Sequence, residues 1–179
     1  MYLSDFHQHL SQLGAKLPHR ERILRAWLDA RPLDSGAGRR DIPEFLPLAV
    51  RQDLPNFAKK LDDLAQVRSE HPAADGSARL LIDLPDGQMI ESVLLPRDGV
   101  CISSQVGCAV GCRFCMTGKS GLLRQVSSLE MVAQVVQARR RRPVKKVVFM
   151  GMGEPAHNLD NVLEAIDILG TDAFIGHKN

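Results

Sequence analysis

The sequence of 179 residues lacks the features that mark membrane and secreted proteins. No apolar run approaches the roughly 20 residues that a membrane-spanning helix needs, and the N-terminus does not resemble a secretory signal peptide. There is no internal repeat and no low-complexity tract. The net charge at pH 7 is only +2, so composition by itself does not indicate a nucleic-acid partner. These absences predict a cytoplasmic protein in a reducing compartment, with no membrane partner.

Cysteine is scarce, and the few cysteines are concentrated in one segment. Three of the four, Cys108, Cys112 and Cys115, form a C-x3-C-x2-C run. Thiolates this close in sequence can all turn toward one small object, such as an iron–sulfur cluster. A [4Fe–4S] cluster with three protein ligands keeps one iron open to a cosubstrate. Radical generation from S-adenosylmethionine (SAM) needs that arrangement, and both groups are carriers of radical chemistry. The spacing therefore favours an open-iron [4Fe–4S] cluster.

Two other interpretations of these cysteines stay open. Structural zinc usually takes two separated pairs of ligands, but no second pair exists here, and His157 and His177 are lone candidates. Inert buried thiols are common singly, whereas three at this spacing would be a coincidence. A disulfide framework is disfavoured because the chain does not resemble a small secreted protein.

The segment after the cysteines predicts a helix, a strand and a second helix. Ser127 and Glu130 form a capping-box pattern that begins the first helix, and Pro143 stops it. Residues 145–150 are apolar and rich in β-branched side chains, which predicts a buried strand. The second helix begins near Asn158 and has an apolar face made of Leu159, Val162, Leu163, Ile166 and Leu169.

The order of these elements indicates an α/β fold class. Residues 100–106 predict a strand that leads into the cysteine loop, so the sequence alternates strand, loop, helix, strand, loop, helix. Such alternation implies parallel strands with right-handed crossovers, in a barrel or a doubly wound sheet. Ligand sites in these folds lie at the carboxyl ends of the strands. Both the cysteine loop and the glycine-rich loop at residues 151–155 fall there.

The glycine-rich loop, Gly151-Met152-Gly153-Glu154-Pro155, has two interpretations. It can be an ordinary tight turn from strand to helix, in which the glycines supply positive φ. Alternatively, strand-end carbonyl groups and the carboxylate of Glu154 are acceptors suited to the ammonium group of SAM. The neighbouring cysteine loop shifts the balance toward the second interpretation.

The first half of the chain carries fewer signals of chemistry. Residues 1 to about 70 predict short helices, and residues 79–84 and 88–95 predict a β-hairpin across Pro85-Asp86-Gly87. We place a domain boundary near residues 96–99, which divides the chain into residues 1–96 and 97–179. The basic run Arg139–Arg142 is either a solvated helix end or an RNA contact.

A family resemblance depends on several of these motifs together. The segment Cys101-Ile102-Ser103-Ser104-Gln105-Val106-Gly107-Cys108 runs straight into the cysteine loop, and Thr117-Gly118, Arg124, Glu130 and the glycine-rich loop follow in order. The sequence is similar to radical SAM enzymes, and more narrowly to the RlmN/Cfr family of ribosomal RNA adenine methyltransferases. The match is dense from Glu91 to Asn161.

The resemblance implies a partial (β/α)6 barrel, here its first two β/α units, behind a small helical N-terminal domain that helps to hold RNA. From the residues alone, Glu91 reads as a solvent-facing strand position and Cys101 as a small buried hydrophobe. The resemblance instead assigns roles to seven residues: the cluster ligands Cys108, Cys112 and Cys115, the SAM contacts Gly153 and Glu154, the proton acceptor Glu91, and Cys101, which resolves a protein–RNA adduct through a transient disulfide.

The reaction that the resemblance implies uses SAM twice. One SAM methylates a mobile C-terminal cysteine, and a second yields a 5′-deoxyadenosyl radical with an electron from an external donor. The radical abstracts a hydrogen atom from that methyl group, and the methyl carbon, now a radical, adds to an adenine carbon in ribosomal RNA or tRNA. No cysteine follows Cys115, and the chain ends at Asn179, where a third strand would begin. Met116 and Arg124-Gln125-Val126 also depart from the expected pattern. A catalytically incomplete fragment, a paralogue with another substrate and a zinc-binding module therefore remain alternatives.

Overall fold

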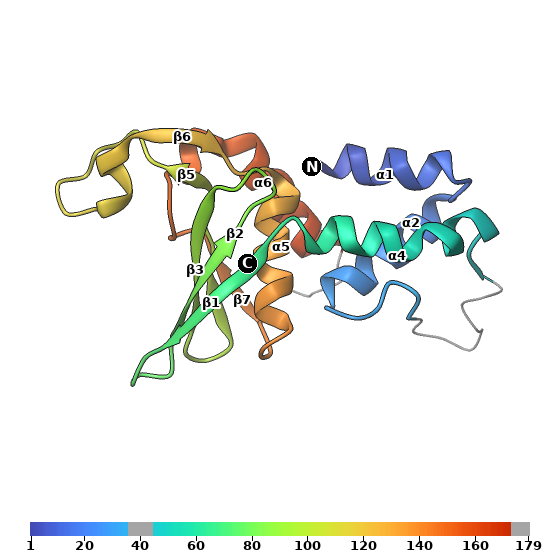
Figure 1. Ribbon diagram of the computed structural model, residues 1–179, viewed down its shortest axis with the longest axis horizontal. Coiled ribbons are helices and arrows are strands. Elements are labelled where there is room, and N and C mark those ends of the chain that lie inside the picture. The colour runs from blue at the N-terminus through green and yellow to red at the C-terminus, as the bar shows by residue number, and fades with distance from the viewer. Residues whose placement is uncertain (36–44, 173–179) are drawn as a thin grey trace.

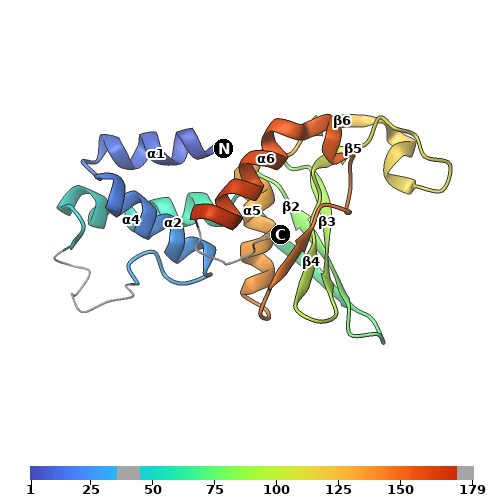
Figure 2. The same ribbon diagram turned by 180° about the vertical axis from the view of Figure 1, so that it is seen from behind.

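A computed structural model describes residues 1–35 and 45–172. A helical unit lies on one side, and a sheet with its covering helices lies on the other (Figure 1). The helical unit contains α1 (Leu3–Gln12), α2 (Leu17–Leu28) and α4 (Leu48–Asp62). Helix α5 (Ser128–Arg139) lies between this unit and the sheet, and α6 (Leu159–Asp167) packs beside α5, as seen from behind in Figure 2.

The helical unit is built around aromatic and aliphatic side chains from α1, α2 and α4. Phe6 and Phe57 are fully buried, with ring centroids 5.2 Å apart. Trp27 is only 3% exposed and belongs to the same core as Leu10 and Ile23. Burial of these apolar side chains is the main contribution to the stability of the unit.

Within residues 1–35 and 45–172 the main sheet has five strands, in the order β1-β2-β3-β4-β7. Its strands are β1 (Gln66–Pro72), β2 (Ala78–Asp83), β3 (Met89–Leu95), β4 (Gly99–Cys101) and β7 (Lys146–Val148). Neighbouring strands are antiparallel except β4 and β7, which are parallel, as the α/β alternation predicts. The predicted hairpin is confirmed as β2–β3. The turn between them has Gly87 at φ +81°, with its N–H donating to the carbonyl of Leu84 at 3.0 Å.

Two strand predictions need correction. Residues 1–70 were expected to be helical, yet β1 begins at Gln66; this strand is polar and mostly exposed at the sheet edge, so it carries no apolar alternation. The single strand expected at residues 100–106 is divided into β4 and β5 (Gln105–Gly107). Strand β5 pairs with β6 (Leu122–Gln125), which was not predicted, in a separate two-stranded sheet.

The apolar patterns after residue 144 are less buried than expected. Val147 and Val148 of β7 are half-buried, because β7 is the last strand of the sheet in the described part of the chain. In α6, Val162 and Ala165 face the core. Leu159, Leu163 and Ile166, predicted on the buried face, are instead 52%, 50% and 42% exposed.

The two sides of the molecule are joined across the predicted boundary. Residues 96–98 form a turn between β3 and β4, with Arg97 and Asp98 at φ +60°, so the division after residue 96 lies inside one sheet. The basic run at the end of α5 also joins the parts. Its four arginines donate to the carbonyl oxygens of Leu28, Gly76 and Leu95 and to the carboxylates of Asp62 and Glu70. Arg140 and Arg141 are nevertheless exposed, so the run is a partly solvated helix end whose cations also join neighbouring elements.

Candidate active site

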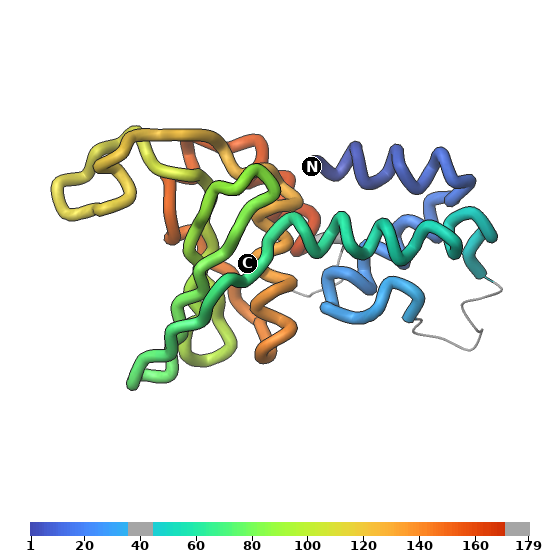
Figure 3. Tube along the Cα trace, viewed as in Figure 1, coloured from blue at the N-terminus to red at the C-terminus, as the bar shows by residue number. Residues whose placement is uncertain are grey.

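The cysteine loop projects from the body of the protein between β5 and β6, clearly visible in the tube drawing of Figure 3. Its base is closed by the Cys108 N–H, which donates to the carbonyl oxygen of Gly121 at 3.0 Å. Gly107 has φ +76°, and a Cβ there would collide with that same carbonyl oxygen. Inside the loop, a Cβ on Gly118 would lie 3.1 Å from the Cα of Gly111. The glycines therefore allow the loop to fold back on itself.

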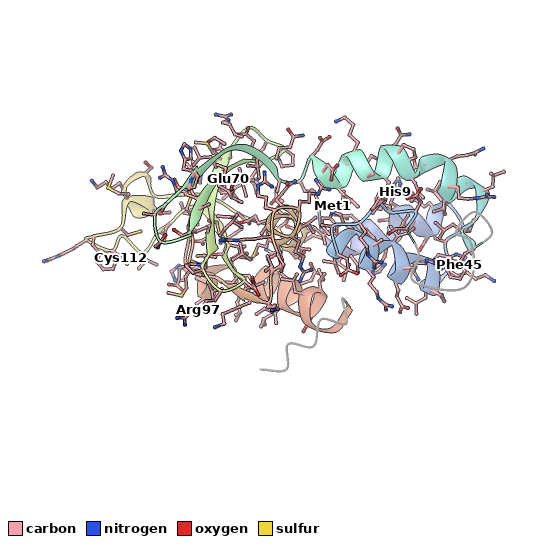
Figure 4. The ribbon with its side chains drawn as sticks, turned by 90° about the horizontal axis from the view of Figure 1, so that it is seen from below. Met1, His9, Phe45, Glu70, Arg97 and Cys112 are labelled. Atoms are coloured by element: carbon pink, nitrogen blue, oxygen red, sulfur yellow. The ribbon has the colours of Figure 1, made fainter. Side chains whose placement is uncertain are left out.

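The three loop cysteines are free thiols with different exposure. Cys108 is buried, Cys115 is half-buried, and Cys112 is exposed at the far end from Phe45 of the helical unit (Figure 4). Hydrogen bonds from the hydroxyl and backbone N–H of Thr117 and from the backbone N–H of Gly118 lower the pKa of Cys115. A lowered pKa favours the thiolate, which is the form that binds metals.

No three His, Cys, Asp or Glu side chains in the described part of the chain are placed to hold a metal ion. The predicted ligands Cys108, Cys112 and Cys115 thus share one loop without converging on one point. Three unpaired thiols on this loop still match the donor set of an iron–sulfur cluster in number and chemistry. Of the two histidines considered for zinc, His177 lies outside the described residues and His157 is exposed.

The glycine-rich loop docks onto the segment that precedes the cysteines. The backbone N–H of Met152 donates to the Ser103 hydroxyl at 2.8 Å, and the backbone N–H of Glu154 donates to Oε1 of Gln105 at 2.7 Å. The N–H groups of Ser104 and Gln105 donate back to the carbonyl of Met152 at 2.9 and 3.2 Å. The glycine-rich loop therefore lies at the carboxyl ends of β4 and β7, against the segment that leads into the cysteine loop.

Close packing explains the glycines of this loop. A Cβ on Gly151 would lie 2.7 Å from the carbonyl oxygen of Ile102, and Gly153 has φ +99° with its Cβ position 2.5 Å from the Cβ of Gln105. The carboxylate of Glu154 is half-exposed and accepts from the N–H of Ala156 at 3.1 Å. It thereby caps the short 3-10 turn η2 (Pro155–Asn158), a structural role that does not exclude a ligand contact.

Glu91 and Cys101 lie on the same face of the sheet. Cys101 of β4 is paired with Val93 of β3, and Glu91 lies two residues before Val93 on β3. Such diagonal neighbours are roughly 7–8 Å apart. The neighbouring Ser92 points to the opposite face, where its hydroxyl donates to Gln134 of α5 at 2.8 Å. The carboxylate of Glu91 is 40% exposed and lies 3.3 Å from Arg79.

Cys101 differs chemically from the loop cysteines. It is only 7% exposed, and burial raises the pKa of its thiol, partly offset by a hydrogen bond from the backbone of Met150. A raised pKa keeps the side chain as the less nucleophilic thiol at neutral pH. Cys101 is the last residue of β4, and its hydrogen bond with the backbone of Met150 places it next to the start of the glycine-rich loop.

A partly buried polar network was missed by the sequence reasoning. Nε2 of Gln105 donates to Oε1 of Gln125 at 2.9 Å, and Nε2 of Gln125 donates to the carbonyl of His157 at 2.8 Å. Nδ2 of Asn158 donates to the carbonyls of Ser104 and Val126 at 2.7 and 2.8 Å. The available signal was the run Ser103-Ser104-Gln105, three polar residues placed directly after a buried strand.

Comparison with known proteins points in the same direction as the geometry. Residues 102–177 match the family described as "Radical SAM superfamily". Two curated relatives, from Ectopseudomonas mendocina and Stutzerimonas stutzeri, are both named "Probable RNA methyltransferase" and are 71% and 69% identical over 179 residues. Each match covers 100% of this chain and 52% of the relative. The chain therefore spans about half the length of these relatives.

A solved structure supports the fold. The radical SAM methyltransferase from Sphaerobacter thermophilus matches with a TM-score of 0.72 and 36% identity, over 94% of this chain and 50% of that chain. The predicted fold class, α/β with part of a radical SAM barrel sheet, is confirmed. None of the helices in the described ranges has the length and apolar character to cross a membrane.

Proposed function

We propose that this chain is the first part of a radical SAM methyltransferase that methylates an adenine carbon in ribosomal RNA. The observation that carries the proposal is the docking of the glycine-rich loop onto residues 103–105, which lead directly into the cysteine loop. The candidate SAM loop thus contacts the segment that leads into the candidate cluster loop, which supports the proposal. The two relatives with RNA methyltransferase names support RNA as the substrate class.

In this proposal Cys108, Cys112 and Cys115 hold a [4Fe–4S] cluster. When bound, the cluster supplies the single electron, received from an external donor, that cleaves SAM. The hydrogen bonds that lower the pKa of the half-buried Cys115 favour its thiolate, the form that binds metals. The glycine-rich loop binds SAM, with the Gly153 carbonyl and the Glu154 carboxylate as acceptors for the ammonium group.

In this proposal Glu91 and Cys101 act in the steps that involve the RNA substrate. They share the face of the sheet opposite α5, and the exposed carboxylate of Glu91 would accept the proton that leaves the adenine carbon. Cys101 would resolve the protein–RNA adduct by forming a disulfide. Its raised pKa keeps it unreactive until a partner sulfur is brought against it. The helical unit, residues 1–35 and 45–62, would help to position the RNA.

The direct test is genetic, because it uses the protein in its own cell. Ribosomal RNA and tRNA from a strain lacking the gene are digested and compared by mass spectrometry with those of the parent strain. We expect one methyladenosine to disappear from ribosomal RNA and to return with the wild-type gene but not with Cys112→Ala. Loss from tRNA alone would favour a paralogue with another substrate. Unchanged nucleosides in both RNA classes would contradict the proposal.

A further inference from the structure

We propose that Gln105 is a positioning residue that orients the peptide between Gly153 and Glu154 so that its carbonyl faces the SAM ammonium group. The inference rests on the proposed function, and nothing in the motif spacing assigns this role to Gln105. Its side chain is completely buried, and its Oε1 accepts from the Glu154 N–H at 2.7 Å. This bond joins the segment before the cysteines to the candidate SAM loop.

Because a peptide unit is planar, this hydrogen bond also fixes the direction of the Gly153 carbonyl. In a trans peptide the N–H and C=O groups lie in one plane and point in opposite directions. Anchoring the Glu154 N–H on Gln105 therefore aims the Gly153 carbonyl away from the buried side chain and toward the outside of the loop. Without the anchor, Gly153 could turn this peptide readily, because glycine tolerates most backbone conformations.

The orientation of the Gln105 amide is itself fixed by its neighbours. The chain of hydrogen bonds begins at the carbonyl of His157, which can only accept, so Gln125 must present its NH2 group there. Oε1 of Gln125 then faces Gln105, which must present its own NH2 group. Oε1 of Gln105 is left for the Glu154 N–H, which can only donate. The polarity of the chain permits one amide orientation at each glutamine.

The position of Gln105 along the chain adds a second consequence. Gln105 begins β5, which ends at Gly107, directly before Cys108. A Cβ at Gly153 would lie 2.5 Å from the Cβ of Gln105, so loop and strand are in direct contact. Gln105 therefore joins the SAM loop to the strand that leads into the cluster loop. Its side chain bonds to the SAM loop and not to the cysteines, so we expect its loss to affect SAM binding more than cluster retention.

The first test compares Gln105→Met with Gln137→Met in anaerobically reconstituted protein. Gln137 is a matched control: it is also a buried glutamine, but its Nε2 donates to the carbonyl of Ala65, where α5 meets the helical unit. We expect Gln105→Met to lower SAM affinity about tenfold or more, because it removes one hydrogen bond that orients an acceptor toward a charged group. The iron content should be unchanged. Gln137→Met should bind SAM like the wild type. Equal SAM affinity in both variants would overturn the inference.

The second test needs no cofactor. Amide hydrogen exchange at Glu154, measured in the cofactor-free protein, should be faster in Gln105→Met than in the wild type and unchanged in Gln137→Met. Gln125→Met removes the group that fixes the orientation of the Gln105 amide, so exchange at Glu154 should be intermediate between the wild type and Gln105→Met. This variant leaves Gln105 in place, so it still tests the inference if Gln105→Met does not fold. Unchanged exchange in both Gln105→Met and Gln125→Met overturns the inference. If the wild type itself does not bind SAM, the proposed function fails, and the exchange result still decides whether Gln105 holds the peptide.

Discussion

Arg124 and Glu130, two residues on which the family resemblance depends, form a bidentate ion pair. Nη1 lies 3.0 Å from Oε2, and Nη2 lies 3.0 Å from Oε1. The same carboxylate accepts from the backbone N–H of Ser127 at 2.8 Å, which confirms the predicted capping box. Nε of Arg124 also donates to Asp86 at 2.5 Å. One guanidinium thus joins β6, the start of α5 and the β2–β3 turn.

Removing this arginine should be strongly destabilising. Glu130 is only 5% exposed, so Arg124→Met leaves a buried carboxylate without its counter-charge, and we expect a loss of about 3–5 kcal/mol in the free energy of unfolding by urea. The double variant Arg124→Met/Glu130→Met should lose less than the single variant. The control is Arg79→Met, which breaks the exposed pair with Glu91 and should cost under about 1 kcal/mol. Equal costs for the two single variants would contradict this account.

The ion pair with Asp86 should depend on pH. The hydrogen bond from Arg124 lowers the pKa of Asp86, so its stabilising contribution is present above the unfolded pKa of about 3.9 and is lost as pH falls through the lower folded value. Because Asp86 is partly exposed, the contribution at pH 7 should be at most about 1 kcal/mol. Urea unfolding of Asp86→Asn and the wild type should differ at pH 7, and the difference should shrink as the pH falls below about 3.9. A constant difference would exclude this titration.

The basic run at the end of α5 should matter for stability rather than for RNA. Arg139 is half-buried and donates to the carbonyl of Leu28 at 2.6 Å, whereas Arg140 meets Asp62 in an exposed pair. We expect Arg139→Met to cost about 1–3 kcal/mol and Arg140→Met under about 1 kcal/mol in urea unfolding. Each variant removes one positive charge, so the pair also tests RNA contact. A reduced salt dependence of RNA affinity in both variants would restore the RNA interpretation.

The four cysteines should react with alkylating agents in a fixed order in the cofactor-free protein. Exposed Cys112 and half-buried Cys115 should be modified by iodoacetamide first, and buried Cys108 and Cys101 last. The raised pKa of Cys101 means that its modification should accelerate only at clearly alkaline pH. Peptide mapping by mass spectrometry at pH 7 and pH 9 measures the order. Early modification of Cys101 at pH 7 would contradict its placement in the sheet.

The sequence was sufficient for the parts of the fold that depend on local patterns. A capping box, a β-branched run and a Pro-Asp-Gly turn predicted α5, β7 and the β2–β3 hairpin in that order. The rule that ligand loops follow the carboxyl ends of strands predicted the place of the glycine-rich loop. It was insufficient where tertiary contacts decide. Strand β1 is a polar edge strand without periodicity, and the exposure of Leu163 depends on what packs against α6. The role of Gln105 was hidden because only the folded chain shows which buried amide meets which backbone group.

SAM binding through Glu154 should depend on the charge of its side chain. Glu154→Gln keeps an oxygen that can accept from the Ala156 N–H, so the turn η2 is preserved while the negative charge facing the ammonium is lost. We expect SAM affinity to fall about tenfold, measured by calorimetry on reconstituted protein. Glu164→Gln, a change on the nearby helix α6, is the charge-matched control and should bind SAM normally. Unchanged affinity in Glu154→Gln would remove this residue from the SAM site.

The most direct measurement is the metal content and electron paramagnetic resonance spectrum of protein reconstituted without oxygen. The wild type and Cys101→Ala should both hold a [4Fe–4S] cluster whose reduced spectrum changes when SAM is added, because SAM reaches an open iron. The variant with Cys108, Cys112 and Cys115 all changed to Ala should hold no cluster. Stoichiometric zinc in the wild type, or undiminished iron in the triple variant, would contradict the account.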